Sequence, residues 1–222
     1  MIRMVVFDMA GTTVDEDNVV YKTLQSEINK AGFSFSLEQV LAEGAGKEKR
    51  QAIKDILALD AAVPDEATVN IIYQSFVDEL ATAYNSFQLK PQPGAEELFQ
   101  SLRDEHVLVI LNTGYNAHTA QAILSKLNWQ TGNQIDGLIT SSDVENNRPN
   151  PDMIHLAMAK FGIVNADEVV KLGDSIIDIE EGKNAGCKLS IGITTGAHSY
   201  RQLATANPDH IIHHLADLLP LI

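Results

Sequence analysis

Five polar residues of this sequence have types and positions that could form a chemical site. Each lies directly after a short apolar run or in the loop that follows one: Asp8, Thr113, Arg148, Asp174 and Asp178. In open parallel sheets, ligands bind at the carboxyl ends of the strands, so side chains at those ends converge on one crevice. A carboxylate there can act as a nucleophile, while a hydroxyl, free backbone N–H groups and an arginine can bind phosphate oxygens.

Three of the five residues are acids, and this has an electrostatic consequence. Asp8, Asp174 and Asp178 would repel one another in one crevice unless a cation lay among them, and hard oxygen ligands near a phosphate suit Mg²⁺. The chain has a formal net charge of −14, so a metal and Arg148 must provide the attraction for an anionic ligand. Taken singly, each residue could be a helix cap, a turn residue or a solvated charge. Their shared position after apolar runs favours a common site.

The apolar runs that carry these residues alternate with helical patterns after residue 90. The expected strands are residues 4–7, 107–111, 137–139, 169–172, 189–193 and 210–212. Buried strands that are continuously apolar and separated by helices are typical of a parallel sheet with both faces covered. We therefore expect an α/β fold with a doubly wound parallel sheet.

The segment between the first strand and the rest of the core has a different pattern. Helical spacing dominates it, as in the series Ile71, Phe76, Leu80 and Tyr84, and no strand is expected between residues 18 and 87. Proline and glycine near residue 93 mark the return to the core. The pattern predicts a helical cap at residues 15–86, inserted into a core of residues 1–14 and 87–222.

Composition limits the partners and the compartment. Hydrophobic residues make up 45% and charged residues 21%, and no run approaches the roughly 18 apolar residues of a membrane span. The acidic balance offers no basic footprint for nucleic acid or an anionic membrane, so we expect small-molecule partners. The first residues do not resemble a signal peptide, and a single cysteine suits a reducing compartment, so a cytoplasmic location is expected. The oligomeric state stays open, a homodimer included.

The motifs resemble the four motifs of the haloacid dehalogenase superfamily. Those motifs are an Asp-x-x-Gly-Thr strand end, a Ser/Thr, a Lys/Arg and a Gly-Asp-x-x-x-Asp segment, and all four occur here. The resemblance implies a Rossmann-like core with a helical cap, and a nucleophile, Asp8, that forms an aspartyl-phosphate. It also implies phosphate binding by Thr113 and Arg148. It implies Mg²⁺ held by Asp8, the backbone carbonyl of Ala10, Asp174 and Asp178.

Ala10 departs from the pattern of most phosphatases and mutases in this superfamily. Those enzymes carry an aspartate at this place, where it protonates the leaving oxygen. Losing a general acid typically lowers a rate by roughly 10² to 10⁴, so ordinary alkyl phosphates would be poor substrates. Residues 8–15 are similar to the phosphonatase branch, the phosphonoacetaldehyde hydrolases, which have alanine there. In that branch a cap lysine forms a Schiff base with the aldehyde, which makes C–P cleavage possible.

A lysine of the cap is the expected Schiff-base residue. Alignment of Gly46 with the glycine of the branch places Lys49 at that position, with Lys47 as the second candidate. The like-charged neighbours Lys47, Arg50 and Lys54 are expected to lower the pKa of Lys49. The resemblance also implies contacts with the substrate by Thr12, Gly114, Lys47 and Tyr115.

Two departures from the branch leave the substrate open. The branch has a histidine where Ala52 stands and a cysteine near the position of Asn18. The leading hypothesis is a hydrolase for a small phosphonated or phosphorylated carbonyl compound. The alternative enzyme is a phosphatase of small esters such as phosphoglycolate, with a good leaving group or an acid from the cap. A non-catalytic phosphate-binding protein is a third hypothesis, which retention of the nucleophile Asp8 argues against.

Overall fold

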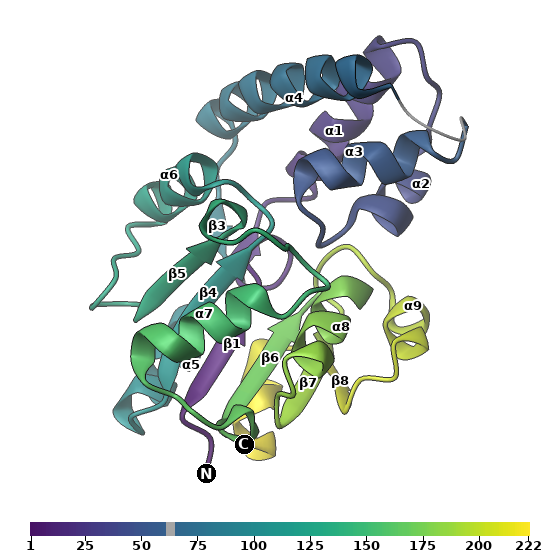
Figure 1. The fold of residues 1–222 in the computed structure, drawn as a ribbon. Helices are drawn as coiled ribbons and strands as arrows, with labels where there is room; N and C mark the ends of the chain where they lie inside the picture. Colours follow the sequence, from purple (N-terminus) through teal and green to yellow (C-terminus); the bar gives the residue numbers. More distant parts are fainter. Residues whose placement is uncertain (61–64) are drawn as a thin grey trace.

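A six-stranded parallel sheet forms the centre of the computed structural model, which describes residues 1–60 and 65–222 (Figure 1). The strands are β1 (Met4–Phe7), β4 (Leu108–Thr113), β5 (Gly137–Thr140), β6 (Val169–Gly173), β7 (Leu189–Ile193) and β8 (His210–Ile212). Their order is β5-β4-β1-β6-β7-β8, so the chain winds outward from β1 in both directions. This order places the carboxyl ends of β1, β4 and β6 side by side at the switch point, where α/β folds bind ligands. The predicted α/β fold with a doubly wound sheet is confirmed.

Side chains of β1 alternate between two hydrophobic layers. Val5 and Phe7 pack in one layer with α5, while Met4 and Val6 pack in the other with α7. Both layers are apolar, which explains why the strand has a continuous rather than an alternating apolar pattern. The helices of the core are α5 (Ala95–Asp104), α6 (Ala117–Leu127), α7 (Asp152–Phe161), α8 (Ile176–Asn184) and α9 (Tyr200–Thr205). The 3₁₀ helices in the described part of the chain are η1 (Ser141–Asp143), η2 (Ala166–Glu168) and η3 (Leu215–Leu221).

Four helices of the described residues lie between β1 and α5 in the chain, and they stand beyond the carboxyl edge of the sheet (Figure 1). They are α1 (Val19–Lys30), α2 (Leu37–Gly44), α3 (Lys49–Leu57) and α4 (Glu66–Ser86). Side chains cap the start of three of them: Ser36 accepts a hydrogen bond from the Gln39 N–H, Glu48 accepts from the Arg50 N–H, and Asp65 accepts from the Thr68 N–H. The apolar face of α4 includes Ile72, whereas Ile71 is 69% exposed, so the predicted series was wrong at that one position.

None of the helices in residues 1–60 and 65–222 has both the length and the apolar composition required to cross a bilayer. The longest, α4, has 21 residues but carries charged and polar side chains along its exposed face. The helix is therefore amphipathic, with an apolar face buried against the other cap helices and a polar face exposed.

Two short strands join the helical insert to the core. β2 (Val14–Asp15) pairs antiparallel with β3 (Lys90–Pro91), and the Gln92 N–H donates to the Thr13 carbonyl at 2.8 Å. Segments of two residues cannot display a periodicity, so the sequence pattern did not predict these strands. The exact division into a core of residues 1–14 and 87–222 and a cap of residues 15–86 stays a prediction, and its residues 61–64 lie outside the described part.

Candidate active site at the carboxyl ends of the strands

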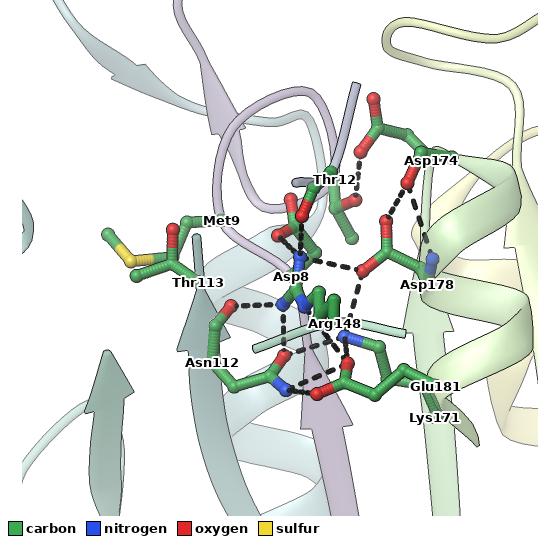
Figure 2. A network of polar contacts seen from close by, with 12 residues as sticks. Asp8, Met9, Thr12, Asn112, Thr113, Arg148, Lys171, Asp174, Asp178 and Glu181 are labelled. Atoms are coloured by element: carbon green, nitrogen blue, oxygen red, sulfur yellow. Dashed lines mark hydrogen bonds and ion pairs between the residues drawn. The ribbon is translucent and has the colours of Figure 1, made fainter. Parts of the chain in front are cut away.

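Asp8 is the first residue after β1 and lies inside the crevice. Its N–H donates to the Leu172 carbonyl at 2.9 Å, which continues the pairing of β1 with β6 by one residue. The Thr13 hydroxyl donates to the Asp8 carbonyl at 2.9 Å, and this closes a tight turn. Gly11 in that turn has φ +83°, and a Cβ there would lie 2.6 Å from Asp174 Oδ2, so glycine is required. The carboxylate is 5% exposed and points towards the other acids (Figure 2).

Asp174 and Asp178 meet Asp8 from the other side of the switch point. Carboxylate oxygens of the three residues lie within 4.8 Å of one another, and all three side chains are buried. Asp174 belongs to the turn after β6, since α8 begins only at Ile176, and Asp178 lies in the first helical turn. The turn between β6 and α8, rather than helical spacing alone, therefore brings the two acids together.

Hydrogen bonds fix both acids of the turn. Asp174 accepts from the Ala197 N–H at 2.6 Å and from the Thr12 hydroxyl at 3.0 Å. Asp178 accepts from the Ser175 hydroxyl at 2.6 Å. Thr12, which was expected to contact substrate, thus orients Asp174 in this structure.

Two buried cations, Arg148 and Lys171, form ion pairs with the acids. Arg148 contacts Asp8 at 2.6 Å and Asp178 at 2.9 Å, and Lys171 contacts Asp178 at 2.9 Å (Figure 2). Glu181 accepts ion pairs from both cations, at 3.0 Å from Arg148 and 3.1 Å from Lys171. Asn112 ties the group together, because its Oδ1 accepts from both cations and its amide donates to Glu181. Arg148 is thereby locked beside the nucleophile candidate.

The buried charges of this network do not balance. When ionised, four acids (Asp8, Asp174, Asp178 and Glu181) face two cations (Arg148 and Lys171), which leaves an excess of two negative charges. Burial and repulsion from Asp178 raise the pKa of Asp8. Burial and repulsion from Asp8 and Asp178 raise the pKa of Asp174 well above its usual range. One divalent cation among the three aspartates would balance the excess, so the donor set fits the expected Mg²⁺.

Asp178 behaves differently from the other two aspartates. Burial opposes its ionisation, but the charges of Arg148 and Lys171 outweigh burial and lower the pKa of Asp178. The Ala10 carbonyl, the fourth expected metal ligand, belongs to the turn after Asp8. The backbone hydrogen bonds of that turn use the carbonyls of Met9 and Val14, so they do not engage the Ala10 carbonyl.

Thr113, Gly114 and Tyr115 occupy the carboxyl end of β4. Thr113 is the last residue of the strand, and its hydroxyl accepts from the Tyr115 N–H at 3.1 Å. A Cβ on Gly114 would lie 2.5 Å from the Lys47 carbonyl oxygen, so glycine allows the cap loop to approach the core here. Tyr115 is 3% exposed and faces the cap rather than solvent.

Lys49 is the cap lysine that faces the core. Its side chain is buried, and its Nζ lies 5.3 Å from the ring centre of Tyr21 and 5.4 Å from that of Tyr115. The Nζ also donates to the Lys47 carbonyl at 2.9 Å. Burial lowers the pKa of Lys49, while the negative charge of Asp8 acts in the opposite direction. Lys49 and Asp8 therefore share one electrostatic environment.

The expected cause of this lowered pKa was wrong. The Nζ of Lys47 forms an ion pair with Asp55 at 2.5 Å. Glu66 forms ion pairs with Arg50 at 2.8 Å and with Lys54 Nζ at 2.5 Å. These acids neutralise the neighbours, so burial acts on Lys49 instead, with a smaller contribution from Arg148. Lys47, the second amine candidate, is held in its ion pair with Asp55.

Sequence reasoning missed several polar residues of the site. Lys171 and Glu181 are fully buried charges, and Lys171 stands inside an apolar run, where it was counted as a strand residue. The spacing of Glu181, three residues after Asp178, was an available signal because it puts both acids on one helical face. Glu16 and Tyr84 form a buried hydrogen bond across 68 residues of sequence, and no local pattern indicates it.

Comparison with known proteins agrees with the fold and the motifs. Residues 5–191 match the family model described as haloacid dehalogenase-like hydrolase. The chain is 31% identical over 212 residues to a phosphonoacetaldehyde hydrolase of Parabacteroides distasonis, an alignment that covers 89% of this chain and 78% of that protein.

Solved structures show the same fold. A phosphonoacetaldehyde hydrolase like protein from Oleispira antarctica has a TM-score of 0.85 at 20% identity, covering 99% of this chain and 91% of that one. A predicted phosphoglycolate phosphatase from Haemophilus somnus has a TM-score of 0.79 at 19% identity, covering 99% and 97%. The family model spans most of the chain, and the relative from Parabacteroides confirms the expected branch. The chain therefore belongs to the haloacid dehalogenase-like hydrolases and is similar to the phosphonoacetaldehyde hydrolases among them.

Proposed function

We propose that this protein is a phosphonatase-like hydrolase of a small phosphonated or phosphorylated carbonyl compound. Asp8 attacks the phosphorus, and the resulting aspartyl-phosphate is then cleaved by water. The observation that carries the proposal is a buried lysine, Lys49, in the same site as Asp8, with alanine where a leaving-group acid would stand. The named relative supports phosphonoacetaldehyde as the compound to test first.

The network around Asp8 suits a displacement at phosphorus. Arg148 holds one carboxylate oxygen at 2.6 Å and keeps the other free to attack. The backbone N–H of Gly114 and the hydroxyl of Thr113 lie at the end of β4, where they can bind the oxygens of the transferring group. A Mg²⁺ held by Asp8, Asp174, Asp178 and the Ala10 carbonyl would add positive charge for those oxygens.

Lys49 activates the carbon that leaves the phosphorus. Its amine adds to the carbonyl carbon and expels the oxygen as water, which gives an imine. When the C–P bond breaks, its electron pair moves into the imine and yields an enamine, so the leaving carbon needs no acid at position 10. Burial removes water from Lys49 and lowers its pKa, which favours the neutral amine beside the rings of Tyr21 and Tyr115. Ala10 leaves room beside Asp8 for this bulkier leaving group.

Borohydride trapping with phosphonoacetaldehyde tests the amine. We expect a reduced adduct on Lys49 in the wild type and in the matched variant Lys47→Arg, and none in Lys49→Arg. Peptide mass spectrometry locates the adduct. Absence of an adduct together with turnover of phosphoglycolate would replace this proposal by the phosphatase alternative.

The nucleophile needs its own measurement. Asp8→Asn keeps the shape of the side chain but removes the attacking charge, so turnover should fall by about 10⁴ or more. Phosphate release with Mg²⁺ present measures it. Binding of orthovanadate that persists in the variant would show that the site is still formed. Turnover close to that of the wild type would rule out Asp8 as the nucleophile.

A further inference from the structure

A buried carboxyl group outside the metal site lies at the junction of the cap and the core. Glu16 follows β2 and is 3% exposed. Its Oε2 accepts the Val20 N–H at 3.0 Å and the Tyr84 hydroxyl at 2.6 Å. No cation within hydrogen-bonding distance pairs with it among the described residues, which is unusual for an acid at this depth. The chemistry described above gives this group no task.

The hydrogen bonds of Glu16 continue towards Lys49. The hydroxyls of Tyr84 and Tyr115 are 2.7 Å apart, so Glu16, Tyr84 and Tyr115 form one continuous chain. The ring of Tyr115 is one of the two aromatic surfaces against Lys49 Nζ. The chain therefore connects a carboxyl group on the cap side of the hinge with the surface on which the amine rests.

The protonation state of Glu16 decides which way this chain points. Each tyrosine hydroxyl has one proton to donate. When Glu16 is a carboxylate, Tyr84 donates to it and Tyr115 donates to Tyr84, so the proton of Tyr115 is already used. When Glu16 is protonated, both bonds can reverse, and Tyr115 is free to donate elsewhere in the site.

Glu16 is suited to change its state near neutral pH. Burial raises the pKa of Glu16 to about 7, against the lowering effects of its hydrogen bonds and of the Lys49 charge. Burial lowers the pKa of Lys49, so the two groups approach each other in proton affinity. The titratable groups around Glu16 are Tyr21 on α1, Lys49 on α3, Tyr84 on α4, Tyr115 after β4 and Asp8 after β1.

We propose that Glu16 is a positioning residue that accepts and returns a proton for Lys49, acting through the hydroxyls of Tyr84 and Tyr115. The inference rests on the proposed amine chemistry of Lys49. In the transfer, Nζ of Lys49 turns from the Lys47 carbonyl, its acceptor in this structure, to the Tyr115 hydroxyl, loses one proton and becomes an amine. The proton moves along the hydroxyls of Tyr115 and Tyr84, and the Glu16 carboxylate gains one proton and becomes a carboxylic acid. One positive and one negative charge disappear together, so the step creates no net charge in the buried site and needs no other reactant. Return of the proton restores the ammonium when the product leaves.

The test measures the rate of adduct formation on Lys49 against pH. Phosphonoacetaldehyde and cyanoborohydride are the probes, applied to the full chain with Mg²⁺ from pH 5 to 9. The variants are Glu16→Gln, which keeps the shape of the side chain, and Tyr84→Phe, which removes only the linking hydroxyl. Glu27→Gln is the matched control, because Glu27 is also a buried cap carboxylate that accepts a hydroxyl hydrogen bond, from Ser75 at 2.6 Å, but lies outside the chain to Lys49.

We expect the wild type and Glu27→Gln to show an inflection near pH 7, with faster trapping above it. Glu16→Gln should lose the inflection, and its trapping rate at pH 7.5 should fall roughly 100-fold, the lower end for loss of an acid–base group. Tyr84→Phe should show the same loss. If Glu16→Gln does not fold, Tyr84→Phe alone tests the proton transfer to Glu16.

If a folded Glu16→Gln variant keeps the inflection, the role of Glu16 is overturned; Tyr84→Phe decides in the same way if only that variant folds. An adduct in the wild type would still support the proposed function in that case. Absence of any adduct on Lys49 in the wild type would overturn the amine function and this inference together. The two failures are therefore distinguishable by the wild-type reaction alone. A merely structural Glu16 would lower the rate at all pH values without removing the inflection.

Discussion

Replacement of Glu16 by glutamine should make the stability of this protein less sensitive to pH. Glutamine keeps the size of the side chain and can still accept hydrogen bonds from Tyr84 and Val20, but it cannot ionise. The change therefore removes one titration and leaves the packing of the cap in place. The direction of the effect follows from the raised pKa of Glu16 in the folded protein.

The magnitude follows from linkage between protonation and folding. The pKa of Glu16 rises from an ordinary 4.5 to about 7 on folding. Between these values the folded state binds more protons than the unfolded state, so the stabilisation is fully present below pH 4.5 and is lost as the pH rises through 7. Each pKa unit corresponds to about 1.4 kcal/mol. The free energy of unfolding of the variant, relative to that of the wild type, should rise by roughly 2 to 3 kcal/mol from pH 5 to pH 8.

Thermal unfolding by calorimetry at pH 5, 6, 7 and 8, with EDTA present, measures this difference. For a chain of this size the expected change corresponds to roughly 4 to 12 °C in the difference between the two midpoints. Glu27→Gln is again the control. The pKa of Glu27 is lowered, because Lys30 and Ser75 outweigh burial, so it is ionised in both states above pH 5 and its difference should be nearly flat.

A flat difference for Glu16→Gln over the same range would refute the reasoning. It would mean that Glu16 ionises inside the folded protein as easily as in water. The hydrogen bonds from Tyr84 and Val20 would then fully offset its burial, and Glu16 would be unable to exchange a proton with Lys49 near neutral pH.

Three further changes test other parts of the site. Arg148→Met leaves three buried acids without their shared guanidinium, so it should destabilise the protein by about 3 to 5 kcal/mol, measured by chemical unfolding; a loss below about 1 kcal/mol would contradict the network. Asp174→Asn removes a carboxylate whose pKa burial and repulsion raise, so the metal-free variant should melt above metal-free wild type, while calorimetric titration shows at least about tenfold weaker Mg²⁺ binding. Gly46→Ala should lower kcat/KM about tenfold, because a Cβ there collides with Ser175 Oγ and unseats the cap loop. Gly32→Ala is its control, since Gly32 also has positive φ but open space around it, and an equal effect in both would assign the loss to backbone strain.

The residues at the strand ends were predictable because their positions depend on local sequence and on one topological rule. A short apolar run followed by an acid places Asp8 and Asp174 at a sheet edge, and parallel strands make those edges coincide. Their convergence at one edge of the sheet needed no further information. Thr113 and Arg148 were found in the same way, although Thr113 lies within its strand rather than after it.

Residues that act through long-range packing were not predictable in this way. Lys171 is indistinguishable from a strand residue in the sequence, and only the fold shows that two acids of α8 surround it. The lowered pKa of Lys49 was attributed to charged residues near it in the sequence, because the sequence reveals such neighbours but not burial. The tertiary structure pairs those neighbours with acids and turns Lys49 towards the core, which changes the physical cause.

Arg148 links the position of the cap to the state of the nucleophile. The same Nη1 atom donates to Asp8 at 2.6 Å and to the carbonyl of Gly46 at 3.4 Å, so the cap loop and the attacking carboxylate share one donor. Withdrawal of the loop would remove an acceptor from Arg148 and leave more of its hydrogen bonding to the acids. Because Gly46 lies three residues before Lys49, the carbonyl that contacts Arg148 and the buried amine belong to one segment of the cap. The contact of the cap loop with the core and the orientation of Asp8 therefore depend on the same guanidinium. Glycine at position 46 permits this contact, because a Cβ there would collide with Ser175.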